Sequence, residues 1–137
     1  MVNDIQITLL TSEEYNKYRN IIPVINDWWW CKDACPGYHR FVRCVCSDGA
    51  LNNNNCNINY GVRPVLKLNL SNLKSLNPGD YIQIGSKGFT ILSWDEFRLI
   101  ALCDEFIATR RFDPDNSDWE RSELKEWLET EGLKLIF

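Results

Sequence analysis

Four cysteines and the only histidine of the chain lie within residues 27–49, DWWWCKDACPGYHRFVRCVCSDG. The first two cysteines are separated by three residues and the next two by one. Two converging pairs of thiolates can complete the tetrahedral coordination of zinc. We therefore predict a structural Zn²⁺ site that leaves no open position for catalysis. Its predicted ligands are Cys31, Cys35, Cys44 and Cys46, with His39 and Cys56 as alternatives.

The alternation of side chains along a strand favours thiols that face outward. In a strand through RCVC, Cys44 and Cys46 point to one side and Val45 to the other. If Val45 faces the core, both thiols face away from it, and a preceding loop with Cys31 and Cys35 folds over them. Two other interpretations stay open: free thiols buried in the core, and thiols used for disulfides or redox chemistry.

The start of the chain, MVNDIQITLL, has no basic segment followed by a long apolar one, so we expect no signal peptide. No apolar run reaches the roughly 18 residues of a membrane span. We therefore predict a cytoplasmic protein that does not bind membranes. Thiols are kept reduced in the cytoplasm, which favours metal binding over disulfides.

The composition is that of a soluble globular protein, with 45% hydrophobic and 25% charged residues in a chain of 137. This length suits one domain. The net charge is −4, and residues 75–137 carry thirteen acidic and seven basic side chains. This balance disfavours direct binding of nucleic acid.

The acidic side chains are concentrated in residues 113–131, which hold eight acids and two bases. Such a face is either simply solvated or complementary to a basic surface of another protein. The tryptophans at 28–30 add a second candidate surface, although consecutive residues cannot all face one way and some should lie in the core. The predicted partner-binding residues are Trp28, Trp29, Trp30, Asp113, Asp115, Asp118, Glu120, Glu123 and Glu126.

Two further features have structural interpretations. The run Asn52–Asn55 could bind a ligand through its amides, but a polar strand edge or loop is the simpler interpretation. Arg63 stands between apolar neighbours and precedes Pro64, and we interpret it as a structural arginine rather than a partner contact. A single histidine and the absence of Gly-x-Ser-x-Gly and phosphate-loop motifs lead us to expect no enzyme activity.

The first half of the chain predicts strands joined by turns and one helix. A capping box at Thr11 and Glu14 begins a helix over about residues 12–20, which ends before Pro23 and leads into a long loop with the tryptophans. Alternating residues predict strands before and after a turn at Asp48 and Gly49, and a further strand over 60–70.

The second half follows a turn-rich segment. We predict two halves of one domain, 1–70 and 80–137, joined by a linker over 71–79. A hairpin follows over 81–92, and residues 93–106 fit either a helix or a second hairpin. A capping box at Ser117 and Glu120 begins a helix that ends at Gly132. The predicted class is α+β, with antiparallel strands and two short helices.

Several segments together resemble a domain of unknown function from Firmicutes and their phages: ITLLTSEEYNKY, WWWCKDACPG, VCSDGALNNNNCNINYGVRPVLKLNL and FDPDNSDWERSELKEWLETEG. Members of that family read WWLRSPG, then SDG, then GVRPA. The resemblance implies a C-type-lectin-like outline and a hairpin over residues 89–102. The order of segments is exchanged relative to the family, so the chain resembles a circular permutant. The cysteine cluster is an addition of this chain.

The resemblance to phage proteins and the lack of catalytic groups suggest a binding protein. Our prediction is a monomeric, non-enzymatic phage or prophage inhibitor that binds a host defence protein, specifically an anti-CRISPR protein acting on a Cas9-type effector. The alternative is a lectin-like module that binds a carbohydrate or a small ligand through the tryptophans and asparagines.

Overall fold

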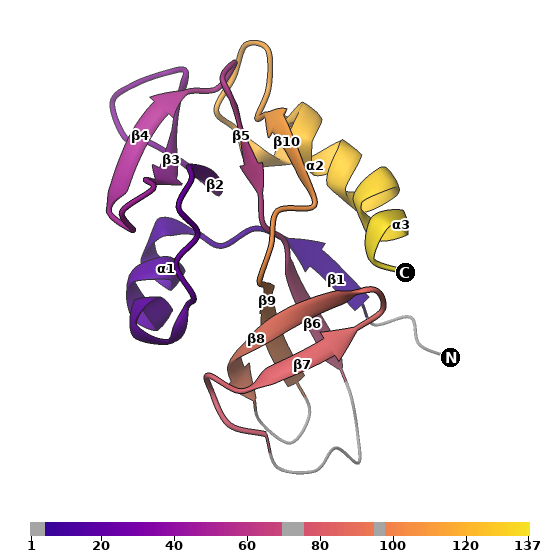
Figure 1. Cartoon of the computed structure of the whole chain (residues 1–137). Coiled ribbons are helices and arrows are strands. Elements are labelled where there is room, and N and C mark those ends of the chain that lie inside the picture. The colour runs from indigo at the N-terminus through magenta and orange to yellow at the C-terminus, as the bar shows by residue number, and fades with distance from the viewer. Residues whose placement is uncertain (1–4, 70–75, 95–97) are drawn as a thin grey trace.

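Ten strands form two five-stranded sheets within residues 5–69, 76–94 and 98–137, which are the residues described by the computed structural model (Figure 1). All neighbouring strands are antiparallel except β2 and β5. This architecture confirms the predicted α+β class. The first sheet has the order β1 (Ile5–Thr8), β6 (Val65–Asn69), β9 (Arg98–Cys103), β8 (Lys87–Trp94) and β7 (Tyr81–Ile84). The second has the order β10 (Ala108–Arg111), β5 (Asn59–Val62), β2 (Trp29–Ala34), β3 (Phe41–Val45) and β4 (Leu51–Asn55).

The chain passes from the second sheet to the first at Arg63 and Pro64. One strand was predicted over residues 60–70, but the structure has two, β5 and β6, which belong to different sheets. Proline cannot donate a ladder hydrogen bond, so it suits a point where one strand ends and another begins. Both sheets also combine strands from the two predicted halves, since β6 pairs with β9 and β5 with β10.

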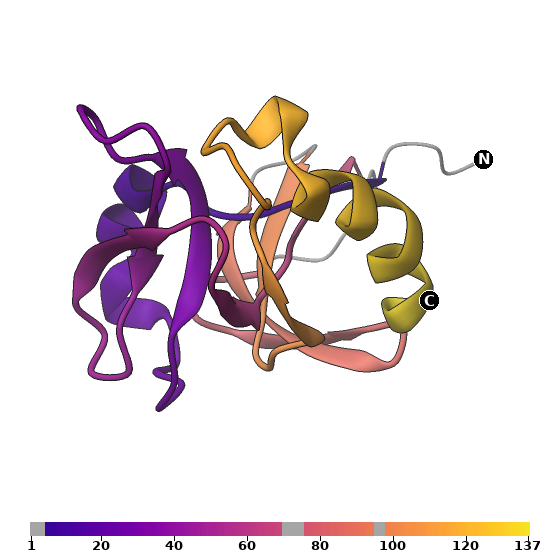
Figure 2. The same cartoon turned by 90° about the horizontal axis from the view of Figure 1, so that it is seen from above.

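The central strands are buried on both faces, and each face contributes to a different hydrophobic core. Neighbouring residues therefore alternate between the cores: Trp30 and Leu66 lie in the larger core, whereas Trp29 and Val65 lie in the smaller one. The larger core is covered by the C-terminal helical segment and the smaller one by α1 (Ser12–Tyr18). Figures 1 and 2 show these two helical regions on opposite sides of the molecule.

The predicted capping box of α1 is confirmed. The backbone N–H of Glu14 donates to Thr11 Oγ1 at 3.0 Å, and the N–H of Thr11 donates to Glu14 Oε1 at 2.9 Å. A 3₁₀ turn, Arg19–Ile21, follows the helix. Tyr15 is the buried residue of α1, and its ring lies edge-on to Trp29 with the ring centroids 5.6 Å apart. This contact fixes the helix over the smaller core.

The C-terminal helical segment begins later and continues further than predicted. A 3₁₀ turn, Trp119–Arg121, precedes α2 (Glu123–Trp127), whose N-cap is Ser122 and not Ser117. The predicted end at Gly132 is wrong, because this glycine has a helical φ of −61° and the segment continues through a π-helical turn, Leu128–Gly132, into α3 (Leu133–Ile136). Leu124 and Leu128 are fully buried, which confirms the predicted apolar stripe.

The predicted hairpins are confirmed where the structure describes them. Strands β3 and β4 flank a turn in which Gly49 has a φ of +91°, and β7 pairs with β8. The described residues on either side of 95–97 lie in strands and not in a helix, because β8 and β9 pair antiparallel. Residues 95–97 lie outside the described residues. The same holds for residues 70–75, which include most of the predicted linker.

The turn between β7 and β8 binds the end of α3, and this contact gives a first test of the fold. Gly85 has a φ of +61°, and a Cβ atom there would overlap the carbonyl oxygen of Ile136. The next residue, Ser86, donates its backbone N–H to that same oxygen at 2.7 Å. We expect Gly85→Ala to lower the free energy of unfolding by about 3 kcal/mol or more, because it adds a backbone overlap to the usual cost of a left-handed conformation.

The matched control for this measurement is Gly37→Ala. Gly37 also has a positive φ, +85°, but a Cβ atom added there would meet no other atom within 4 Å. Its substitution should cost only the conformational strain, about 1–2 kcal/mol in urea unfolding. Equal losses for the two variants would contradict the docking of the β7–β8 turn against α3.

Candidate functional site

The predicted zinc ligands Cys31 and Cys44 lie on neighbouring strands but on opposite faces of the second sheet. Both side chains are fully buried, Cys31 in the smaller core and Cys44 in the larger core. The expectation that Cys44 faces outward is wrong. It assumed that burial of Val45 leaves the other face exposed, whereas both faces of this sheet are covered. The tryptophans and Cys31 also lie in a strand, β2, and not in the predicted loop.

The remaining candidate ligands are dispersed. Cys35 is buried just after β2, and its sulfur contacts the carbonyl oxygen of Pro36 at 3.9 Å. Cys46 is half-buried beyond β3 and accepts a hydrogen bond from Asn52 Nδ2 at 3.5 Å. His39 is exposed, and Cys56 is buried in the larger core.

No three histidine, cysteine, aspartate or glutamate side chains converge to hold a metal ion within residues 5–69, 76–94 and 98–137. The four predicted thiols therefore do not fit a zinc site as they are placed. Zinc binding stays a prediction of the sequence, and it would require Cys31 and Cys44 to leave separate cores. Metal analysis of the purified protein tests it directly.

The buried thiols are held in their neutral form. Burial raises the pKa of Cys31 well above its usual range, and the nearby Asp33 raises it further. Burial also raises the pKa of Cys44 to about 12. A neutral thiol is a weak nucleophile and a poor metal ligand, so both residues act here as small apolar groups in the core.

Two of the three predicted tryptophans are not available to a partner. Trp29 is 1% exposed and Trp30 is fully buried, with its indole N–H donating to the carbonyl of Arg110 at 2.9 Å. The prediction that these two bind a partner is wrong, because the first three residues of β2 are buried and the two tryptophans lie in separate cores. Trp28 is partly exposed and stacks on Tyr60 with ring centroids 5.4 Å apart.

The asparagine run forms an edge strand, β4, as the polar-edge interpretation expected. Cys46 and Cys56 donate backbone N–H groups to Ala50 and Arg40, and this ladder pattern directs the N–H groups of Asn53 and Asn55 away from β3. Each of those outward groups donates instead to the amide oxygen of the preceding asparagine, at 2.8 and 2.9 Å. The amides are thus used within the strand and are not arranged around a ligand.

Two of the predicted partner-binding acids stabilise the fold instead. Asp113 is 6% exposed, and its carboxylate accepts backbone N–H groups of Asp115, Asn116 and Glu123. Burial alone would raise the pKa of Asp113, but these three hydrogen bonds and Arg111 outweigh it and lower the pKa. Glu123 forms a two-point ion pair with Arg111 at 2.9 and 3.1 Å. Its pKa is lowered mainly by this hydrogen bonding to Arg111.

The other predicted acids, Asp115, Asp118, Glu120 and Glu126, are exposed. Glu120 and Glu126 line one open hollow with Glu129, Ser122 and two cations, Arg121 and Lys125. Lys125 lies 3.9 Å from Glu120 and 3.1 Å from Glu129, so one cation is shared between two acids and Glu126 adds a further charge. The structure brings two of the predicted acids, Glu120 and Glu126, together with Glu129, which was not predicted. We call these three residues the acidic face.

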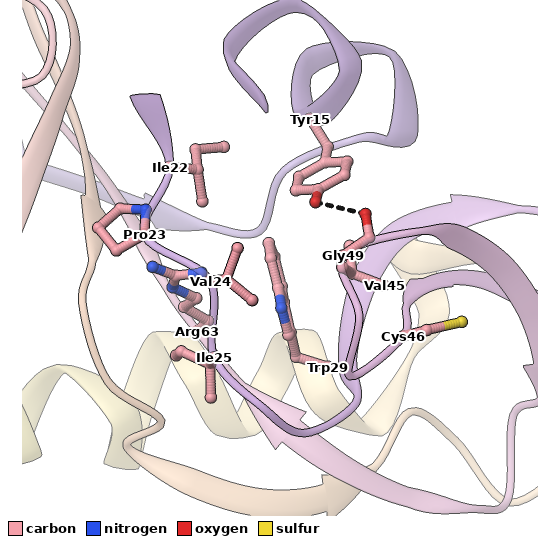
Figure 3. A pocket seen from close by; sticks show the side chains of 10 residues that line it. All are labelled: Tyr15, Ile22, Pro23, Val24, Ile25, Trp29, Val45, Cys46, Gly49 and Arg63. Carbon is pink, nitrogen blue, oxygen red and sulfur yellow. Dashed lines mark hydrogen bonds between the residues drawn. The ribbon is translucent and has the colours of Figure 1, made fainter. Parts of the chain in front are cut away.

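A polar feature of the smaller core was not predicted from the sequence. Arg63 is fully buried and donates its Nε to the carbonyl of Cys103 at 2.6 Å, but Nη1 and Nη2 have no hydrogen-bond partner among the described residues. The guanidinium lies 5.0 Å from the ring centroid of Trp29. Figure 3 shows both side chains lining a small hollow beneath the segment Ile22–Ile25. The apolar neighbours of Arg63 in the sequence indicated that it is buried, but not that Nη1 and Nη2 lack hydrogen-bond partners within the described part of the chain.

Residues 5–70 match the family model described as Domain of unknown function (DUF6273). This segment includes α1, the tryptophans, the cysteine cluster and Arg63. No curated protein and no solved structure matches the chain. Among the described residues, no helix has the length and apolar character needed to cross a membrane. The chain is therefore similar over just under half of its length to a family whose description assigns no function.

The burial of the thiols predicts their reactivity. All six cysteines lie in the described residues, and Cys46 is the one that is not buried. We expect Cys46 alone to react rapidly with an aromatic disulfide reagent at pH 8. The buried thiols should react only after local or global unfolding exposes them. Cys46→Ser should remove the rapid phase and Cys35→Ser should leave it in place. Rapid reaction of Cys31 or Cys44 would contradict their placement in separate cores.

The buried carboxylate of Asp113 gives a pH-dependent prediction. Its pKa is lowered in the folded state, so its contribution is present above the unfolded pKa of about 3.9 and is lost as the pH falls through the lower folded value. We expect Asp113→Asn to lower the free energy of unfolding at pH 7 by about 1–3 kcal/mol.

The measurement is urea unfolding at pH 7 and at pH 3. The difference in the free energy of unfolding between wild type and Asp113→Asn should shrink at the lower pH. At pH 3 the unfolded wild-type chain binds a proton at Asp113 more readily than the folded one, which favours unfolding. Asp115→Asn is the matched control, since that side chain is 83% exposed, and it should change stability by less than about 0.5 kcal/mol. A pH-independent difference would argue against a role for the charged form of Asp113.

Proposed function

We propose that this chain is a non-enzymatic binding module that docks on a basic surface of another protein through its acidic face. The observation that carries the proposal is the clustering of Glu120, Glu126 and Glu129 around one open hollow at the start of the C-terminal helix. Asp113 accepts the backbone N–H of Glu123, and Glu123 accepts a hydrogen bond from Arg111. These contacts stabilise the loop and helix that carry the acidic face.

Charge supports this choice of partner. The acidic face holds three carboxylates around Lys125. Arg121 lines the same hollow and is paired with the neighbouring Asp118, and Glu131 is paired with Lys134. These ion pairs are exposed, and exposed pairs contribute little, so an approaching basic surface can replace them at small cost. Complementary charge of this kind mainly accelerates association and selects the partner.

The specific form that we propose is a phage or prophage inhibitor of a host defence nuclease, of the anti-CRISPR type. A nuclease that binds nucleic acid presents a basic channel, and an acidic face can compete for such a surface. The resemblance of the tryptophan and GVRP segments to a phage-associated family adds support. We also propose that the chain is a circular permutant of that family. The lectin-like alternative depended on tryptophans of which two are buried, and on asparagines of which two amide oxygens accept backbone hydrogen bonds within β4.

The test is binding to a purified Cas9-type nuclease, with and without its guide RNA. We expect binding to the guide-free nuclease that weakens steeply between about 0.05 and 0.2 M salt. Glu120→Lys combined with Glu126→Lys should weaken binding about tenfold or more and reduce its salt dependence.

The matched control is Glu13→Lys on α1, because Glu13 is exposed but does not line the hollow of the acidic face, and it should leave binding within about twofold. Unchanged binding in the double variant would refute the acidic face as the docking surface. No binding to the nuclease in either state would refute the anti-CRISPR form of the proposal.

A further inference from the structure

The hollow beside Arg63 contains a buried positive charge that makes no ion pair among the described residues. The charge is that of Arg63, which is fully buried. None of the ten residues that line the hollow is an aspartate or glutamate (Figure 3). An unpaired buried charge is strongly destabilising, so such groups in folded proteins are normally paired.

The guanidinium is fixed in its position by its other contacts. Its Nε donates to the carbonyl of Cys103, and its face is covered by the ring of Trp29. Burial lowers the pKa of Arg63 to about 10, although the negative charge of nearby Asp104 opposes this shift, so the group stays charged at neutral pH. Two donor atoms, Nη1 and Nη2, are therefore held in place without an acceptor.

The other polar group near the hollow does not supply that acceptor. The hydroxyl of Tyr15 donates to the carbonyl of Gly49 at 2.6 Å (Figure 3). Arg19 Nη2 donates to the same carbonyl at 2.7 Å. The rest of the wall is largely apolar, with Val24 and Ile25 on the covering segment. None of the residues that line the hollow therefore supplies an acceptor for Nη1 and Nη2.

The size of the hollow restricts what can enter. The space open to the centre of a water-sized sphere is about 10 Å³, which is room for one water molecule or one monatomic ion. Phosphate, nucleotides and sugars are too large. Water would accept hydrogen bonds from the guanidinium but would not neutralise its charge. A halide ion accepts the hydrogen bonds, neutralises the charge and tolerates apolar walls.

We infer that the hollow lined by Arg63, Trp29 and the segment Ile22–Ile25 is a binding site for one small monovalent anion, of which chloride is the physiological example. The anion accepts the hydrogen bonds of Nη1 and Nη2 and neutralises the guanidinium. Its binding ties α1 and the covering segment to the point where the chain passes between the two sheets. This anion site is independent of the acidic face and of any partner protein.

The first test measures thermal unfolding of the full chain as potassium gluconate is replaced by potassium chloride at constant ionic strength. Gluconate is too large for the hollow. An anion that binds only the folded state should raise Tm by about 5 °C for each tenfold increase in chloride above its Kd. Arg63→Met should lose this shift.

Arg110→Met is the matched control, because Arg110 also stacks on a tryptophan, at 4.7 Å from the Trp127 ring centroid, but does not line the hollow. It should keep the chloride shift. A wild-type Tm that is independent of chloride up to about 0.5 M would overturn the inference.

Crystals of the wild-type chain grown in sodium bromide provide a second measurement that does not depend on the folding of Arg63→Met. A peak of bromide anomalous scattering within hydrogen-bond distance of Nη1 and Nη2 supports the site. A peak without anomalous scattering identifies a water molecule and refutes the anion. An empty hollow refutes it as well.

Discussion

The burial of β2 on both faces is the constraint on which the rest of the structure depends. Trp29 and Trp30 are neighbours in sequence, yet they form the centres of two different cores. A buried tryptophan removes about 150–250 Å² from water, which corresponds to a gross gain of about 4–6 kcal/mol each. A strand that carries both must be covered on each side, and α1 and the C-terminal helical segment provide that cover (Figures 1 and 2). The position of nearly every candidate site residue follows from this arrangement.

The cysteine cluster illustrates the consequence. In sequence, four thiols within sixteen positions suggest one site. In space, β2 and β3 divide them between two cores and two loops, and burial keeps Cys31 and Cys44 protonated. The spacing of the residues was compatible with zinc, but spacing alone cannot decide which face of a strand is covered. That decision depends on α1, whose contact with Trp29 is not encoded locally.

The sequence predicted local features well and long-range ones poorly. The capping box at Thr11 and Glu14, the turn at Gly49 and the hairpins depend on residues close together in the chain, and all are present. The break at Pro64 was missed because an apolar alternating run continues across it. The helix end at Gly132 was misplaced because glycine also tolerates a helical φ where Leu128 packs closely against it. The same holds for the charged residues. The exposed acids could be predicted from the sequence, but the role of Asp113 as an acceptor of backbone N–H groups follows only from the folded structure.

The edge strand β4 has a consequence for how copies of this protein behave beside one another. Threonine or valine would suit a strand better than asparagine by intrinsic propensity, so the run Asn52–Asn55 gives up some strand stability. In return, two amide oxygens occupy backbone donors that would otherwise recruit a strand from another molecule. This disfavours edge-to-edge aggregation at β4, because a strand that pairs there must first displace the protein's own asparagine side chains from these backbone N–H groups.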